Sequence, residues 1–174
     1  MGGYDPYSSS KGCADLLASS YRNSFFNEKD YGTKHQTLLA TCRAGNVIGG
    51  GDWAQDRLIC DVMRAAAKNE AVTIRNPHAT RPWQHVLEPL SGYLLVGQKL
   101  LEGRKEFGGA WNFGPSDDSA IRVLDVLKSA KRYWDKIEFK IGSDTDQPHE
   151  ANLLKLDCSK AHALLGWEPV WDSE

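Results

Sequence analysis

Tyr7 and Lys11 are the residues whose types and spacing best suit chemistry on a hydroxyl group. They stand four residues apart, just after Asp5 and Pro6, which predict a helix start as N-cap and first helical residue. Residues at this spacing share a helix face, so the ammonium group would lower the pKa of Tyr7. Tyr7 is therefore a candidate proton acceptor for an alcohol that is being oxidised. An ordinary amphipathic helix would show the same spacing, so the pair alone does not decide between the two interpretations.

The helix that would carry this pair is predicted to run to about residue 28. Four further residues continue the face of the pair at steps of three and four, namely Ala14, Ala18, Tyr21 and Phe25. Such a stripe is expected to be buried or packed against another element. A chance pair would more often lie on the polar face, so the stripe favours a role for both residues.

A buried strand and a glycine-rich loop are predicted to follow. The run 37–43 is short, apolar and not alternating, which fits a strand buried on both faces of a parallel sheet. The loop 44–53 contains four glycines and follows the carboxyl end of that strand, where open α/β sheets bind ligands. A tight structural turn explains the glycines equally well.

The rest of the chain alternates between helical and extended patterns. Helices are predicted over 58–66, 89–101, 124–134 and 159–165, and strands over 72–74, 110–113, 137–141 and 153–156. Gly166 is expected to end the last helix as its C′ residue. The alternation favours an α/β architecture.

Composition excludes several classes of function. No run approaches the roughly 20 apolar residues that a membrane span needs, and the N-terminus does not read as a signal peptide. With 21 basic and 23 acidic residues the net charge is −2, which gives no electrostatic case for nucleic acid, although local basic spots could bind a phosphate. The histidines lack metal-ligand spacing, so no metal is expected. The scattered cysteines indicate buried thiols in a reducing cytoplasm, namely Cys13, Cys42, Cys60 and Cys158.

Longer motifs resemble the C-terminal half of the CDP-glucose 4,6-dehydratases, a family of extended short-chain dehydrogenase/reductases. Tyr7-x-x-x-Lys11 matches the catalytic pair of the superfamily. The most specific segments are RAGNVIGGGDW at 43–53 and RPWQHVLEPLSGY at 81–93. WNFGP at 111–115, PHEA at 148–151 and LGWEP at 165–169 follow in the expected order. The resemblance covers essentially the whole chain and favours a catalytic role for the pair.

The resemblance implies a fold, a domain division and a reaction. The fold would be the C-terminal part of a Rossmann-like α/β domain plus a smaller α/β substrate-binding domain. Residues 1–48 would belong to the NAD-binding domain and 49–174 mainly to the sugar-nucleotide domain, with some segments returning to the first. The reaction is that of an NAD-dependent lyase, which converts CDP-glucose to CDP-4-keto-6-deoxyglucose and water for deoxysugar biosynthesis. Tyr7 would take the C4 hydroxyl proton, and Lys11 would lower the pKa of Tyr7 and hold the nicotinamide ribose.

The resemblance also implies substrate-binding roles for Asn46, Arg57, Arg81, Trp83 and His149. Asn46 would contact the sugar or its phosphate, and the planar donor fork of Arg81 would bind the diphosphate. Arg57 could equally be a solvated helix charge, and His149 a structural loop residue. Trp53 and Trp83 could stack on the cytosine, although tryptophans more often pack in cores.

Two parts of the family pattern have no match in these 174 residues. They are the G-x-x-G-x-x-G turn that seats the NAD pyrophosphate and the Thr-Asp-Lys/Glu type motif that supplies the acid and base for elimination. We therefore expect this chain to be inactive alone, with exposed apolar surface that drives formation of a homodimer or higher oligomer. Two alternatives stay open. One is a non-catalytic sugar-nucleotide binding or assembly module, and the other is part of a related nucleotide-sugar epimerase or dehydratase.

Overall fold

The computed structural model describes residues 5–116, 121–142 and 155–172, and the chain divides into two compact units. The first unit comprises Met1–Arg43, Pro89–Phe113 and Asp157–Glu168. The second comprises Ala44–Glu88, Gly114–Leu156 and Pro169–Glu174. Each unit is thus built from segments far apart in the sequence. That the units correspond to a cofactor domain and a substrate domain stays a prediction.

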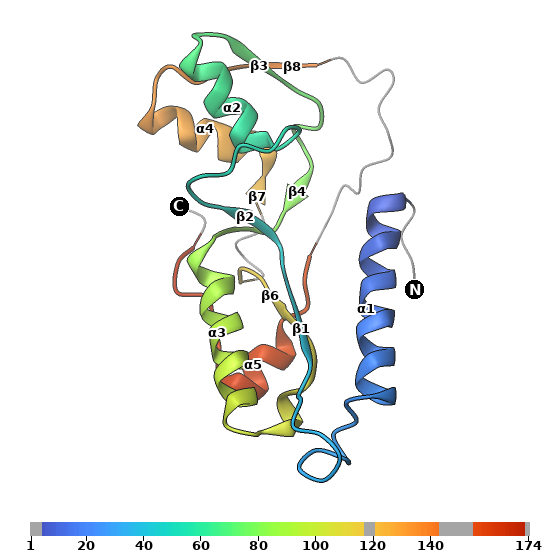
Figure 1. The fold of residues 1–174 in the computed structure, drawn as a ribbon. Coiled ribbons are helices and arrows are strands. Elements are labelled where there is room, and N and C mark those ends of the chain that lie inside the picture. Colours follow the sequence, from blue (N-terminus) through green and yellow to red (C-terminus); the bar gives the residue numbers. More distant parts are fainter. Residues whose placement is uncertain (1–4, 117–120, 143–154, 173–174) are drawn as a thin grey trace. The chain divides into compact units, whose positions relative to one another are not determined.

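The first unit pairs two strands between helices (Figure 1). Its elements are α1 (Pro6–Ser24), β1 (Ala40–Ala44), most of α3 (Leu87–Leu101), a short 3-10 helix (Lys105–Phe107), β6 (Gly109–Phe113) and α5 (Ser159–Leu165). Strands β1 and β6 form a two-stranded sheet. Helix α1 lies on one side of this pair, and α3 and α5 lie on the other.

The core of the first unit is aromatic. Its buried residues are Val96, Phe107, Trp111, Phe113, Ala161 and Trp167. Phe113 is fully buried, and its ring makes edge contacts with the rings of Tyr93 and Trp167 at centroid distances of 5.5 and 4.9 Å. Gly166 ends α5 in the left-handed conformation with φ 63°, which confirms the predicted helix end.

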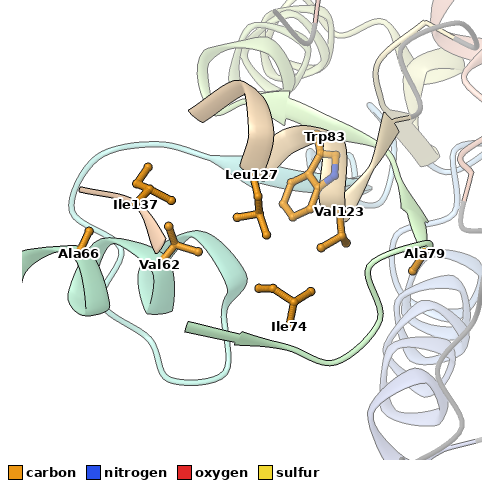
Figure 2. Close-up of a cluster of buried hydrophobic side chains, with 8 residues drawn as sticks. All are labelled: Val62, Ala66, Ile74, Ala79, Trp83, Val123, Leu127 and Ile137. Atoms are coloured by element: carbon orange, nitrogen blue, oxygen red, sulfur yellow. The ribbon is translucent and has the colours of Figure 1, made fainter. Parts of the chain in front are cut away.

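The second unit holds the other elements. They are β2 (Asn46–Ile48), α2 (Leu58–Ala67), β3 (Ala71–Ile74), β4 (Thr80–Arg81), β5 (Trp83–His85), β7 (Ile121–Arg122), α4 (Val123–Tyr133) and β8 (Glu138–Ile141). Strand β2 pairs with β5 and β3 with β8 in parallel, whereas β4 and β7 are antiparallel. Helices α2 and α4 contribute to one apolar cluster with Ile74, Trp83 and Ile137 (Figure 2).

The structure corrects several predicted element boundaries. Helix α1 ends at Ser24 rather than near residue 28, because Asn27 turns back and donates through its side chain to the Asn23 carbonyl. Strand β1 begins at Ala40 rather than at Thr37, and just before it the Leu39 carbonyl accepts the Gly109 N–H at 3.0 Å. Strand β1 is half-buried rather than buried on both faces, since β6 is its only strand neighbour in the described residues.

Two further corrections concern predicted loops and strands. The glycine-rich stretch expected to be a loop contains the short strand β2, which continues almost directly from β1. In the strand predicted over 153–156, residues 155 and 156 are not extended in a sheet, and residues 153 and 154 lie outside the described part. None of the described helices is both long enough and apolar enough to cross a bilayer.

Candidate functional site

Asp5 caps the N-terminus of α1, as the sequence predicts, and it forms a capping box with Ser8. The Ser8 backbone N–H donates to Asp5 Oδ1 at 2.9 Å, and Ser8 Oγ accepts from the Asp5 backbone N–H at 3.4 Å. Pro6 occupies the first helical position. The hydrogen bond from the Ser8 amide lowers the pKa of the Asp5 carboxyl group. The cap therefore fixes where the helix begins and which face each following residue takes.

Tyr7 and Lys11 lie together on this first part of α1. Lys11 Nζ is 5.4 Å from the centroid of the Tyr7 ring, so the shared face predicted from their spacing is confirmed. The predicted burial of this face is wrong, because α1 has no buried residue. Tyr7 is 73% exposed, and Phe25 at the other end of the stripe is 65% exposed. The two-stranded β1–β6 sheet is too narrow to cover the face, so the phenol and the ammonium group are open to a ligand.

Asn46 begins β2 in the second unit, opposite Trp83 of β5. Its backbone N–H donates to the Pro82 carbonyl at 3.0 Å. Gly45 permits this approach, since a Cβ there would lie 2.6 Å from the Pro82 oxygen. The half-buried Asn46 amide side chain makes no hydrogen bond within the described part of the chain. It therefore keeps its donor and acceptor capacity for a ligand.

The loop after β2 is tied to helix α2 by its backbone carbonyls. Arg64 Nη2 donates to the carbonyls of Trp53 and Ala54 at 2.9 and 2.6 Å, and the Cys60 thiol donates to the Asp52 carbonyl at 3.2 Å. Asp52 also accepts from the Ala54 N–H, which lowers the pKa of this carboxyl group. The loop is thus held while the Trp53 side chain stays 72% exposed.

The two predicted arginines differ in their surroundings. Arg57 precedes α2, has a side chain 64% exposed and places Nε 3.6 Å from Asp52 Oδ2. Arg81 in β4 is only 7% exposed and donates from Nη1 to the Thr80 carbonyl at 3.0 Å. Arg57 can therefore reach a solvent-borne ligand without rearrangement, whereas Arg81 contributes from the interior of the unit.

Trp83 packs as a core residue, which is the structural alternative that the sequence left open. It is 7% exposed and lies among Val62, Ile74, Val123 and Leu127 (Figure 2). Its indole N–H is buried and finds no acceptor among the described residues. Trp53, not Trp83, has the exposed ring. His149 lies outside the described residues.

Sequence reasoning missed the role of Glu88. This buried carboxylate accepts the backbone N–H groups of Val170 and Trp171 at 3.0 and 2.9 Å. It thereby holds the segment after Pro169 next to β5, where the rings of His85 and Trp171 are 4.8 Å apart. Burial of a glutamate this close to a helix start has no signature in the local pattern. In the described part of the chain no group of three or more potential ligands could hold a metal ion.

No protein-family model matches the chain. In sequence it is 54% identical over 171 residues to CDP-glucose 4,6-dehydratase from Salmonella typhimurium, a match that covers 98% of this chain and 47% of that protein. The chain is related to CDP-glucose 4,6-dehydratase. UDP-glucuronic acid decarboxylase 3 from Arabidopsis thaliana is more distant, with 28% identity over 143 residues that cover 80% of this chain and 39% of that protein. The chain spans about half the length, or less, of these curated relatives.

Solved structures show which fold this chain has. A UDP-glucuronic acid 4-epimerase from Bacillus cereus, in complex with UDP-glucuronic acid and NAD, matches with a TM-score of 0.77 and 19% identity. The match covers 97% of this chain and 49% of that one. A dTDP-glucose 4,6-dehydratase from Bacillus anthracis, in complex with NAD, matches with a TM-score of 0.71 and 20% identity over 99% of this chain and 49% of that one. The predicted α/β fold, part of the extended short-chain dehydrogenase/reductase fold, is confirmed.

Proposed function

We propose that this chain supplies the Tyr–Lys helix and sugar-nucleotide contacts of an NAD-dependent CDP-glucose 4,6-dehydratase. The observation that carries the proposal is the 54% identity to the Salmonella enzyme over 98% of this chain. The neighbouring positions of Tyr7 and Lys11 on an exposed helix start support it, since both groups are open to a ligand.

The chemistry proposed for this chain is proton transfer. Tyr7 accepts the proton of the C4 hydroxyl of CDP-glucose through its phenolic oxygen. The Lys11 ammonium group supplies positive charge beside the ring and binds the ribose of the nicotinamide half of NAD. Bound NAD supplies hydride acceptance and return.

The chain's residues fit only one end of this cofactor. The exposed phenol and ammonium of α1 suit the nicotinamide ribose, whereas the 174 residues contain no G-x-x-G-x-x-G turn for the pyrophosphate. They also show no match to the motif that supplies the acid and base for loss of water. We therefore propose that the chain alone does not turn over CDP-glucose.

The second unit is proposed to bind the sugar nucleotide. Asn46 has an unused amide, Arg57 an exposed guanidinium and Trp53 an exposed ring on a loop that is held in place. These groups suit a sugar hydroxyl, a diphosphate and a flat base, respectively. Arg81 adds a buried positive charge in the same unit.

The binding proposal is tested by calorimetric titration of the chain with CDP-glucose and, separately, with UDP-glucose. We expect saturable binding of CDP-glucose and weaker binding of UDP-glucose. Arg57→Gln is expected to weaken CDP-glucose binding about tenfold, because a charge-assisted contact is lost. Arg132→Gln, which removes an exposed charge of α4, is the matched control. Absence of binding of both nucleotides, or stronger binding of UDP-glucose, would overturn the proposed specificity.

A non-catalytic sugar-nucleotide binding module is the second candidate, favoured by the lack of a pyrophosphate-binding turn in this sequence. It predicts the same CDP-glucose binding. The two candidates differ in one respect. The binding module predicts no turnover when this chain is joined to the part of a dehydratase that carries the pyrophosphate-binding turn.

A further inference from the structure

Two cationic side chains of the first unit converge on one glycine. Gly109 opens β6 with φ +105°, and a Cβ there would lie 3.7 Å from Lys160 Nζ and 3.8 Å from Arg22 Nη1. Arg22 comes from the last turn of α1 and Lys160 from the first turn of α5. Three segments far apart in the sequence thus place an ammonium and a guanidinium group beside the same side-chain-free point.

Lys160 is held in place rather than free to move into solvent. Its Nζ donates to the Ala110 carbonyl at 3.0 Å and lies 3.9 Å from the centroid of the buried Trp111 ring. An ammonium group has three donors, so further donors remain for a ligand. Arg22 is half-buried, and within the described part of the chain its side chain donates one long hydrogen bond, from Nη2 to Ser19 Oγ at 3.4 Å. The guanidinium also keeps donors for a ligand.

Neither cation has an acidic partner within the described residues. No ion pair of that part of the chain involves Arg22 or Lys160. Asp15 of α1 pairs with Arg43, and Glu106 of the 3-10 helix before β6 pairs with Arg104. Burial, followed by the nearby charge of Arg22, lowers the pKa of the Lys160 ammonium group. An anion beside the two like charges would be attracted by both of them.

We propose that Arg22 and Lys160 form a binding site for a phosphate group over the backbone of Gly109. A guanidinium fork and an ammonium group are the side chains that best bind phosphate oxygens. Because Gly109 has no side chain, both cationic groups can lie close to its backbone. None of these residues takes part in the proposed dehydratase chemistry, so the site does not depend on that function.

The test is a calorimetric titration of the chain with inorganic phosphate at constant ionic strength. Saturable binding is expected, and Arg22→Gln and Lys160→Met should each weaken it by about tenfold or more. Lys160→Met keeps most of the stem that covers the Trp111 ring and removes only the charge. Lys131→Gln is the control, because Lys131 is already paired with Glu138 on the other unit. Lys160→Arg should retain binding.

A second measurement does not depend on the variants folding. In the wild-type chain, phosphate should shift the amide resonances of Gly109 and Ala110. These shifts should reach half of their maximum at the same phosphate concentration as the heat measured by calorimetry. Titration with glucose 1-phosphate then distinguishes the source: comparable affinity indicates a phosphate monoester, and much weaker binding indicates inorganic phosphate. Absence of saturable binding, or unchanged binding in the Arg22→Gln/Lys160→Met double variant, would overturn the proposal.

Discussion

Replacement of Gly92 by alanine should destabilise the first unit, although alanine is the better helix former. A Cβ at Gly92 would lie 2.2 Å from two ring carbons of Phe113, well inside van der Waals contact. The ring would have to move by more than about 1 Å, against dense packing that tolerates little overfilling. Phe113 is fully buried and is in contact with the rings of Tyr93 and Trp167, so no space is open to it.

The size of this effect follows from two opposing terms. Alanine in a helix gains about 1 kcal/mol over glycine. Overpacking of a core costs about 1–3 kcal/mol and more where the neighbour cannot yield. Because the clash is severe, we take the overpacking cost at the upper end of this range, about 3 kcal/mol. After the helix gain of about 1 kcal/mol, the free energy of unfolding should fall by about 2 kcal/mol.

The same helix provides a matched control. Gly97 also lies in α3, but a Cβ there would meet nothing within 4 Å. Gly97→Ala should therefore raise the free energy of unfolding by up to about 1 kcal/mol. Urea unfolding followed by far-ultraviolet circular dichroism measures both variants. If Gly92→Ala were as stable as the wild type, or if both variants lost stability equally, the packing argument would be refuted.

Three further predictions concern the helix cap, the exposed helix face and the buried glutamate. The lowered pKa of Asp5 means that its cap contribution is complete above its ordinary value of 3.8 and is lost as pH falls through the lower folded value. Asp5→Asn keeps a cap and should remove this acid-dependent loss of helicity. If the variant and the wild type gave the same acid titration by circular dichroism, the role of the Asp5 carboxylate in the cap would be contradicted. The exposed side chains of Tyr21 and Phe25 should drive self-association, which Phe25→Lys should reduce in light scattering; a monodisperse wild-type monomer at high concentration would contradict this. Glu88→Ala should speed amide exchange at Val170 about tenfold or more, whereas Glu88→Gln, which keeps an acceptor, should change it less; unchanged protection in both variants would argue against the contact.

The sequence predicted best those features that depend on local chemistry. The Asp5 cap, the shared face of Tyr7 and Lys11 and the left-handed Gly166 all follow from residues within one or two helical turns. Strand β2 was missed, because its pairing with β5 depends on residues almost forty positions away. Periodicity carries no information about such a partner.

Burial was the least predictable property of the site. The stripe that continues from Tyr7 is apolar enough to predict a packed face, yet α1 has no buried residue because the neighbouring sheet has two strands. Arg81 and Trp83 lie two positions apart and are both buried, since strands β4 and β5 lie in the interior of the second unit. The sequence left the Trp83 ring open between stacking on a base and packing in the core, and the resemblance gave Arg81 a ligand; the surrounding segments bury both side chains.

The central claim is that this chain contributes the Tyr–Lys pair of a CDP-glucose 4,6-dehydratase. The most direct measurement is the turnover of CDP-glucose with NAD by a chimera, in which this chain replaces the matching 171 residues of the Salmonella typhimurium enzyme. The chimera should form the 4-keto-6-deoxy sugar, and Tyr7→Phe should lower the rate by about 10²–10⁴-fold. Tyr133→Phe, which alters an exposed tyrosine of α4, should leave the rate unchanged. A folded chimera without turnover, or full turnover in the Tyr7→Phe variant, would contradict the claim.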